Sequence, residues 1–342
     1  LKKDQTPYRV FTPFWKALSA RLIDCWPIAA PDRLPRLPES ANTQRLTLEQ
    51  LDLLPHINWD KGFYSRWKPG EDSAQQNLQT FTDDRLGDYA ELRDYPSHTI
   101  TSQLSPHLHF GEISPRQIHA YIQEQCALLP SIETATGTYL RQLAWREFAY
   151  HLLYHFPVTP EKPLNERFNS FPWRTDYAED LKTWQMGQTG IPIVDAGMRE
   201  LWQTGFMHNR VRMIVASLLC KNLLIPWQEG ARWFWDTLVD ADLANNTLGW
   251  QWVAGCGADA APYFRVFNPV LQSEKFDKDG TYLRRWLPEL GNMPSKWIHA
   301  PWRAEEVVLA NAGISLGRNY PLPIVDLGSS RTRALQAWDA IK

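Results

Sequence analysis

The stretch DADLANNTLGWQWVAGCGADAAPYFRVFNPVLQSEK, residues 240–275, differs from an ordinary core segment. It combines an Asp-x-Asp pair, two adjacent asparagines, two tryptophans at i and i+2, and the run Pro-Tyr-Phe-Arg. A segment that serves only packing does not concentrate polar pairs, glycines and aromatic side chains in this way. The stretch therefore predicts the wall of a pocket for a large, polar, aromatic ligand, such as a cofactor.

Helical patterns precede this stretch along the chain. Residues 138–154 and 207–223 place apolar side chains at i, i+3 and i+4. Residues 225–239 predict a further helix, with Pro226 near its start. Ser114-Pro115 predicts another helix start. Because alternating strand patterns are few and no βαβ rhythm is present, we expect an all-α, mainly helical fold.

Two polar segments are typical of exposed connections, the Pro-rich residues 29–42 and residues 65–80. Neither requires a domain boundary. We divide the chain into a linker-derived and N-terminal helical part, residues 1–80, and a helical domain, residues 81–342, and expect one continuous globule. A chain of 342 residues buries enough surface to need no disulfide or metal for stability.

Composition excludes several classes of protein. The formal net charge of −2 means that any nucleic-acid site is a local basic patch. The four cysteines are scattered, without a CxxC motif or a Cys/His cluster, which argues against zinc and disulfides and fits a reducing compartment. No membrane-length apolar run or signal peptide is present. Most of the 17 tryptophans must belong to the core, but a few could stack on a ligand or carry electrons.

Three further segments carry polar groups suited to ligands. Residues 101–106, TSQLSP, place hydroxyls and amides before a helix, where they either cradle a phosphate or cap the helix. Gln142, Trp145 and Arg146 share one helix face and present an amide, a stacking plane and a cation, although an amphipathic aromatic stripe has the same spacing. Residues 207–213, MHNRVRM, gather polar and basic groups that also suit a solvated turn.

The acidic and aromatic pairs of the opening stretch each leave alternatives. Asp240 and Asp242 either pair with Arg212, bind a ligand or cap the next helix. If the segment is helical, Trp250 and Trp252 point to nearly opposite sides, roughly 160° apart. The two tryptophans therefore cannot face the same partner.

Together these segments resemble the FAD-binding catalytic domain of the DNA photolyase/cryptochrome family, and within it the cyclobutane pyrimidine dimer photolyases. The motifs that carry the resemblance, in chain order, are TSQLSP, LAWREF, TGIPIVDAGMREL, GFMHNRVRM, DADLANN, GWQW and DAAPYFRVFNP. The resemblance implies a helical domain that holds FAD. It also implies a blue-light reaction in which fully reduced FAD lends an electron to a pyrimidine dimer in DNA, with no metal ion involved.

The resemblance also implies a set of cofactor-binding residues. Asn246 matches the residue that faces flavin N5, where asparagine favours a repair enzyme over a cryptochrome. Arg212 and Asp240 match an ion pair beside the flavin ring. The full set is Tyr89, Thr101, Ser102, Gln103, Leu104, Ser105, Tyr139, Arg212, Asp240, Ala241, Asp242 and Asn246.

A second implied set binds damaged DNA. Photolyases are among the enzymes that flip their target out of the stack, which requires a stacking wall and hydrogen bonds. The lesion pocket would be lined by Gln142, Trp145, Arg146, Asn209, Met213 and Trp252. Arg93, Arg210 and Arg265 match phosphate-binding positions, and Gln272 lies near the DNA.

The implied electron relay consists of Trp250, Trp227 and Trp173, with Trp184 as the alternative third member. Together with Asn246 and Gln142, these three tryptophans form the expected catalytic set.

One departure from the family concerns the lesion. Gln142 stands where many dimer photolyases have glutamate, so it can donate a hydrogen bond but supply no proton. The (6-4) photolyases also carry glutamine there, but they rely on histidines at the positions of Asn209 and Met213. We therefore expect a dimer photolyase, with a (6-4) photolyase or a cryptochrome-like photoreceptor as alternatives.

In the family, an N-terminal α/β antenna domain precedes residues similar to VFTPFWKAL, which here are residues 10–18. We therefore expect no antenna domain and no antenna chromophore on this chain, either through truncation or as a natural short form. An inert flavin-binding fragment is a third hypothesis. We further expect a monomer that acts on dimer-containing DNA, without a membrane, in the nucleoid of a bacterial cytoplasm.

Overall fold

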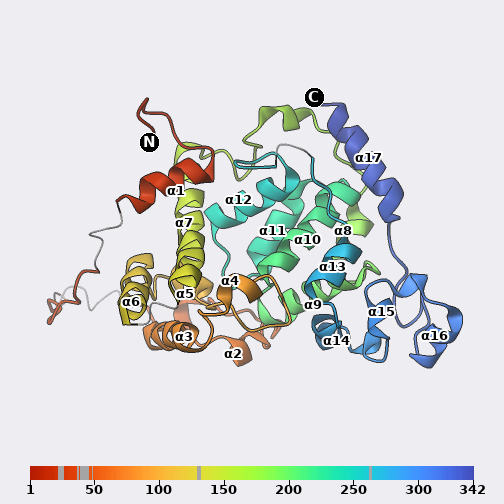
Figure 1. Cartoon of the computed structure of the whole chain (residues 1–342), viewed down its shortest axis with the longest axis horizontal. Helices are drawn as coiled ribbons and strands as arrows, with labels where there is room; N and C mark the ends of the chain where they lie inside the picture. The colour runs from red at the N-terminus through yellow and green to blue at the C-terminus, as the bar shows by residue number, and fades with distance from the viewer. Residues whose placement is uncertain (22–26, 37, 39–45, 48, 129–131, 262–263) are drawn as a thin grey trace.

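The computed structural model describes residues 1–21, 27–36, 38, 46–47, 49–128, 132–261 and 264–342. Helices of very different lengths, joined by irregular connections, make up this part of the chain (Figure 1). The described residues form no strand, and the nearest approach to one is an isolated bridge between Leu316 and Tyr320. The expected all-α fold is therefore confirmed.

The described residues as far as Gln185 form eight α-helices. They are α1 (Phe11–Ser19), α2 (Phe63–Arg66), α3 (Glu71–Asp84), α4 (Tyr89–Leu92), α5 (Ser105–His109), α6 (Pro115–Leu128), α7 (Glu133–His155) and α8 (Ala178–Gln185). Short 3-10 turns lie at Glu49–Leu51 and Glu166–Ser170.

The C-terminal half continues with helices packed around a common core. They are α9 (Pro192–Thr204), α10 (Asn209–Ser217), α11 (Trp227–Thr237), α12 (Leu243–Ala254), α13 (Pro269–Phe276), α14 (Thr281–Trp286), α15 (Ser295–Ile298), α16 (Glu306–Asn311) and α17 (Leu327–Asp339). A π-helical turn, Leu218–Asn222, extends α10, and 3-10 turns lie at Pro288–Leu290 and Pro301–Arg303.

Most of the predicted helices are present with shifted ends. The helix predicted over residues 138–154 is the C-terminal part of α7. Pro226 precedes α11 as its N-cap residue instead of lying in its first turn. At the start of α6, the hydroxyl of Ser114 accepts the backbone N–H of Gln117, whose side chain accepts the N–H of Ser114 in return. This reciprocal capping box satisfies two donors that a helix start leaves open.

Helix α7 links the separate parts of the core. Its N-terminal half packs Ala135 and Tyr139 into a cluster with α3, α4 and α6, and its C-terminal half packs Phe148 and Leu152 against α1. It also packs along α12. Because neighbours cover several of its sides, α7 carries buried residues all round instead of one apolar stripe.

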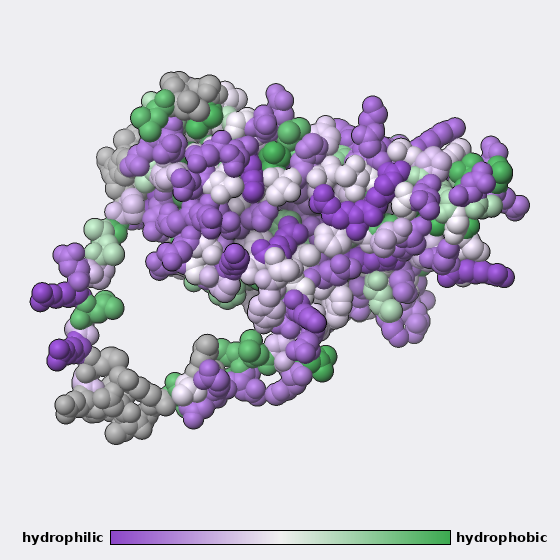
Figure 2. Space-filling model, turned by 90° about the horizontal axis from the view of Figure 1, so that it is seen from below, coloured by the Kyte–Doolittle hydropathy of each residue, from purple (hydrophilic) through white to green (hydrophobic). Residues whose placement is uncertain are grey.

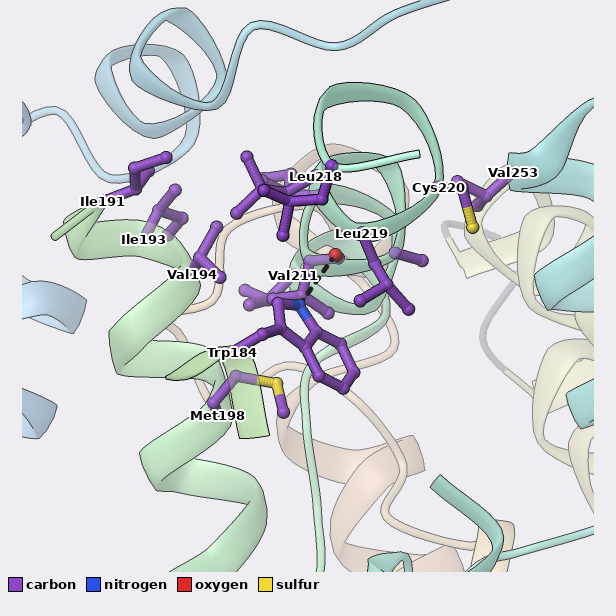
Figure 3. Packing of buried hydrophobic residues seen from close by; sticks show 14 of the residues in the cluster. Trp184, Ile191, Ile193, Val194, Met198, Val211, Leu218, Leu219, Cys220 and Val253 are labelled. Atoms are coloured by element: carbon purple, nitrogen blue, oxygen red, sulfur yellow. Dashed lines mark hydrogen bonds between the residues drawn. The ribbon is translucent and has the colours of Figure 1, made fainter. Parts of the chain in front are cut away.

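The largest hydrophobic cluster lies among α8 to α17. In Figure 3, Trp184 projects between α9 and α10, and its indole N–H donates to the carbonyl oxygen of Val215 at 3.1 Å. This bond satisfies the one polar atom of a fully buried indole. The other labelled side chains come from α9 and the residue before it, from α10, from the π-helical turn and, in Val253, from α12 (Figure 3).

The division of the chain at residue 80 stays a prediction. In support of a continuous globule, α1 and α2 pack on α7 and α9, and the indole N–H of Trp67 donates to the carbonyl oxygen of Thr204 at 2.8 Å. The predicted connection over residues 29–42 lies partly outside the described residues, but Leu34 within it and Ile28 just before it are strongly exposed. Elsewhere, the face seen in Figure 2 is mainly hydrophilic.

No helix within the described ranges is both long enough and apolar enough to span a membrane.

Candidate functional site

Two adjoining hollows lie beside α10–α12. The larger lies between this part of the molecule and α4, α5 and α7, and the smaller lies among α10, α11 and α12. The larger has a volume of about 360 Å³ and the smaller about 210 Å³. They share the residues Asn209, Arg212, Asp240, Asp242 and Asn245. Sites for ligands of drug or cofactor size typically have volumes of about 300–1,000 Å³. The two hollows together are therefore large enough for such a ligand.

One wall of the larger hollow is the segment from Thr101 to Ser105. Gln103 has a left-handed backbone with φ of 56°, and Leu104 follows with φ of −91°. Such alternation turns successive N–H groups toward one side and forms a concavity that binds anions. The helix that follows, α5, has five residues, so the turn itself is the main source of N–H donors. The hydroxyl of Tyr139 donates to that of Ser102 at 3.1 Å and ties the turn to α7.

An ion pair lies on the wall that the two hollows share. One Nη atom of Arg212 lies 3.0 and 2.9 Å from the two carboxylate oxygens of Asp240. The Nε atom of Arg212 donates to the carbonyl oxygen of Met207 at 2.7 Å, so the guanidinium has a fixed orientation. The Asp240 side chain is 6% exposed and that of Arg212 is 25% exposed, so water screens the pair only partly.

Helix α12 presents Asn246 to the smaller hollow. Its Nδ2 atom donates to the carbonyl oxygen of Ala231 at 2.9 Å. A backbone carbonyl oxygen only accepts hydrogen bonds, so it must face the NH₂ group of the Asn246 side chain and not its oxygen. The Asn246 side-chain oxygen is therefore the group left to interact with an occupant of the hollow.

Glycine at position 249 leaves room in the same wall. A Cβ atom added to Gly249 would meet no other atom within 4 Å. Glycine in a helix destabilises it by about 0.5–1 kcal/mol relative to alanine, and here no protein neighbour requires it. The space beside Gly249 is consistent with a site shaped for a bulky ligand.

The two tryptophans of α12 diverge. Trp250 is buried on α11, where a Cβ on Gly230 would lie 2.0 Å from its ring, and its ring centroid is 5.0 Å from that of Phe234. Its indole N–H has no hydrogen-bond partner. Trp252 instead donates to the carbonyl oxygen of Asp259 at 3.1 Å. The expectation that they cannot face one partner agrees with this geometry.

The other expected relay members differ in exposure. Trp227 is buried at the start of α11, and Trp173 is half-buried, with its ring 4.4 Å from that of Phe171. Trp184 is fully buried, and its ring lies 6.2 Å from that of Trp250. The last donor of a relay must be reached by reductants in solution. Exposure therefore favours Trp173 over Trp184, and the third assignment stays a prediction.

The expected face of α7 lies on the larger hollow, which Gln142, Trp145 and Arg146 all line. Phe11 of α1 stacks on Trp145, with ring centroids 3.8 Å apart and planes 7° apart. One face of Trp145 is therefore covered by the protein, and only the other is open to a ligand.

Of the remaining expected residues, some line a hollow and others lie apart. Met213 and Ala241 line the smaller hollow, and Tyr89 and Tyr139 the larger. The residues outside both walls are Trp252, Arg93, Arg210, Arg265 and Gln272. Arg210 is held by Asp94 at 2.6 Å and Arg93 lies 3.9 Å from the same residue, whereas Arg265 is exposed over the ring of Phe267.

The residues that the sequence did not indicate include Asn245, His109 and Tyr150, the last of which binds a wall residue without lining either hollow. Asn245 and His109 line the larger hollow. The hydroxyl of Tyr150 donates to Asp242, and burial together with this bond raises the pKa of Tyr150 to about 12. Its spacing of one helical turn from Arg146 was the available signal.

The part of the chain that the structure describes contains no group of three or more His, Cys, Asp or Glu placed to hold a metal ion. Cys126, Cys220 and Cys256 are free thiols, and Cys25 lies outside the described residues.

The family model described as the FAD binding domain of DNA photolyase matches residues 139–340. That match covers more than half of the chain and includes most of α7 and all of α10, α11 and α12. The chain belongs to the DNA photolyase family. The expected family, enzyme class and helical fold are therefore confirmed.

Relatives within the DNA photolyase family include enzymes and a cryptochrome. The deoxyribodipyrimidine photo-lyase of Agrobacterium fabrum is 49% identical over 341 residues, which are 99% of this chain and 70% of the relative. The structure of a bacterial class III photolyase from Agrobacterium tumefaciens matches with a TM-score of 0.89 and 48% identity, over 100% of this chain and 70% of that one. The cryptochrome of Synechocystis matches with a TM-score of 0.88 and 36% identity, over 97% and 69% of the two chains.

The residues of the hollows suit the FAD that this domain binds. The N–H turn at Gln103 fits an anionic diphosphate, and the carboxylates of Asp240 and Asp242 can accept hydrogen bonds from hydroxyls or amines. The space beside Gly249 and the amide of Asn246 suit a flat, polar ring system.

Proposed function

We propose that this chain is a light-driven DNA repair lyase that splits cyclobutane pyrimidine dimers by electron transfer from reduced FAD. One observation carries the proposal. The larger hollow is lined both by most of the expected cofactor set, including the Thr101–Ser105 turn, and by Gln142, Trp145, Arg146 and Asn209 of the expected lesion set. A cofactor and a flipped-out dimer would share one cavity, as short-range electron transfer requires.

We propose separate tasks for the two sets. The Thr101–Ser105 turn binds the diphosphate, and Arg212, Asp240 and Asp242 orient the rest of the cofactor. Asn246 presents its carbonyl oxygen to the reactive edge, held by its bond to Ala231. Fully reduced FAD, when bound, supplies the photoexcited electron donor.

The residues of the lesion set bind the dimer and orient it. The open face of Trp145 stacks on the dimer, and the amides of Gln142 and Asn209 donate to its carbonyl oxygens. The Nδ2 atom of Asn209 lies 3.9 Å from the sulfur of Met213, so these two side chains adjoin on the wall of the smaller hollow. No proton transfer is assigned to Gln142, because an amide has no acidic group to provide.

DNA phosphates are bound outside the hollows. Arg265 is exposed and free of a carboxylate partner in the described ion pairs, while Arg93 and Arg210 share Asp94. Cationic contacts to phosphates release counterions, so the affinity should fall with salt. Gln272 and Trp252 complete the proposed DNA-facing set.

Trp250, Trp227 and Trp173 are assigned to an electron relay that keeps the cofactor reduced. The buried, unpartnered indole N–H of Trp250 and its place on the wall of the smaller hollow support it as the inner member. We further propose that the protein acts as a monomer on DNA in the nucleoid of a bacterial cytoplasm.

Illumination of the reduced protein with blue light tests the proposal. DNA carrying cyclobutane dimers and DNA carrying (6-4) products are offered side by side, in single- and double-stranded form, with dark incubations as controls. Loss of dimers with (6-4) products unchanged supports the proposal. Unchanged dimers, with flavin bound and reduced, contradict it.

A matched variant makes this test specific to the cavity. Gln142→Met keeps the length of the side chain and removes its amide, so dimer repair should fall by about tenfold, the typical effect of a lost hydrogen bond. Gln123→Met, at an exposed position of α6, should repair like the parent chain.

The similarity to the Synechocystis cryptochrome favours a blue-light photoreceptor as the second candidate. A photoreceptor would bind FAD and undergo photoreduction, but leave both lesions intact in the same assay. The (6-4) alternative requires repair of the other product, and the absence of histidine at positions 209 and 213 argues against it.

A further inference from the structure

Tyr150 connects the two proposed binding sets from behind the cavity walls. It lies on α7, one turn after Arg146, and its hydroxyl donates to the Oδ2 atom of Asp242 at the start of α12. It lines neither hollow and is 39% exposed. Any effect of Tyr150 on the cavity must therefore act through its two partners.

The Asp242 carboxylate is fully engaged by protein groups. Its Oδ1 atom accepts the backbone N–H of Asn245 at 2.8 Å and the Nδ2 atom of Asn245 at 2.7 Å, which caps α12. Its Oδ2 atom receives the Tyr150 hydroxyl, and the ring of His109 lies 3.9 Å away. Asp242 lines both hollows. The groups that donate to its carboxylate therefore determine how strongly its negative charge acts on a molecule bound there.

The same tyrosine also supports Arg146. The guanidinium carbon lies 4.6 Å from the Tyr150 ring centroid, and one Nη atom is 3.4 Å from the Tyr150 hydroxyl. Cation–π contact and this bond hold the guanidinium on the rim of the larger hollow. Tyr150 thus contacts a member of the cofactor set and a member of the lesion set at once.

We infer that Tyr150 is a positioning residue of the photolyase site, which orients the Asp242 carboxylate and neutralises part of its charge beside the bound cofactor. The inference rests on the proposed function only in taking FAD as the occupant beside Asp242. Removing the hydroxyl leaves one carboxylate oxygen without its donor. The freed negative charge then disfavours adding electrons to a neighbouring flavin.

The flavin midpoint potential, measured in the dark without DNA, tests this inference. In Tyr150→Phe, the ratio of reduced to oxidised flavin at a fixed solution potential should fall by about three- to tenfold, the size expected for losing one charge-assisted hydrogen bond. In an Asp242→Asn background the same change should have no effect, because no carboxylate remains. Tyr154→Phe, at an 82% exposed tyrosine one turn further along α7, is the matched control and should leave the potential unchanged.

An unchanged potential in Tyr150→Phe overturns the inference, as does an equal shift in the Asp242→Asn background. Loss of FAD from Tyr150→Phe, with parental circular dichroism and with FAD retained by Tyr154→Phe, supports it. Repair by the parent chain is measured separately. Failure of the proposed function therefore appears as absent repair, whereas failure of this inference appears as an unshifted potential.

Discussion

Phe11 of α1 stacks face to face on Trp145 of α7, with ring centroids 3.8 Å apart. The stack places the first helix of the chain directly behind a wall of the candidate site. Phe11 is 2% exposed, and it also contacts Phe148 edge-on. The N-terminal segment is therefore part of the support of the site.

Truncation of this contact should destabilise the protein. Phe11→Ala removes a buried aromatic ring, so the free energy of unfolding should fall by about 3 kcal/mol. Urea unfolding followed by tryptophan fluorescence measures the change. Val10→Ala, at a 48% exposed neighbour, is the control and should change stability by less than about 0.5 kcal/mol. Equal effects of the two substitutions would show that the stack contributes nothing specific.

Filling the space beside Gly249 should raise stability and weaken cofactor binding. Gly249→Ala improves helix propensity, so the protein without FAD should gain about 0.5–1 kcal/mol. The added methyl group occupies the wall of the smaller hollow, so the affinity for FAD should fall. Thermal melting and flavin titration measure the two effects.

Gly137→Ala is the matched control for that experiment. Gly137 lies in α7, has equally open space around its Cβ position, and lines neither hollow. It should show the same gain in stability with unchanged FAD affinity. A parallel loss of affinity in both variants would contradict the placement of the cofactor beside Gly249.

Salt dependence should distinguish the arginines proposed to bind phosphate. Arg265 is exposed, so Arg265→Gln should reduce the slope of log affinity against log salt by about one. Arg210 is already paired with Asp94 at 2.6 Å, so Arg210→Gln should reduce the slope less. Binding of dimer-containing DNA in the dark, at several salt concentrations, measures both slopes. The opposite order would place the DNA nearer to Arg210.

Acid should destabilise the fold through His208. Burial lowers the pKa of this N-cap histidine from 6.5 to about 4. The unfolded chain therefore binds a proton at a higher pH than the folded chain. Stability from the neutral ring is complete above about pH 6.5 and is lost as the pH falls toward 4, by about 3 kcal/mol in total.

His208→Asn isolates this contribution. Asparagine can still accept the backbone N–H of Arg210 as an N-cap but does not titrate. The unfolding free energy of the parent minus that of the variant should fall by about 3 kcal/mol between pH 7 and pH 4. Parallel curves would assign the acid sensitivity to other groups. Burial raises the pKa of Asp195 to about 6, so this residue makes both proteins more stable as the pH falls below 6. Its contribution cancels in the comparison of parent and variant.

Much of the fold and of the site could be predicted from the sequence. The i, i+3, i+4 spacing of apolar residues and the Ser114 cap predicted real helices, because these signals depend on neighbours within one or two turns. The family motifs identified the Arg212–Asp240 pair and most of the larger hollow's lining. The opposite orientations of Trp250 and Trp252 followed from helix geometry alone.

What the sequence by itself determined about this protein is its helical class, its family and the identity of the polar residues at the site. Only the tertiary structure decided which of those residues meet and what stands behind them. Phe11 covers one face of Trp145, Tyr150 binds Asp242 across 92 residues of chain, and open space lies beside Gly249. The physical reason is that helix periodicity is a local property, whereas contacts between helices depend on how α1, α7 and α12 pack against one another.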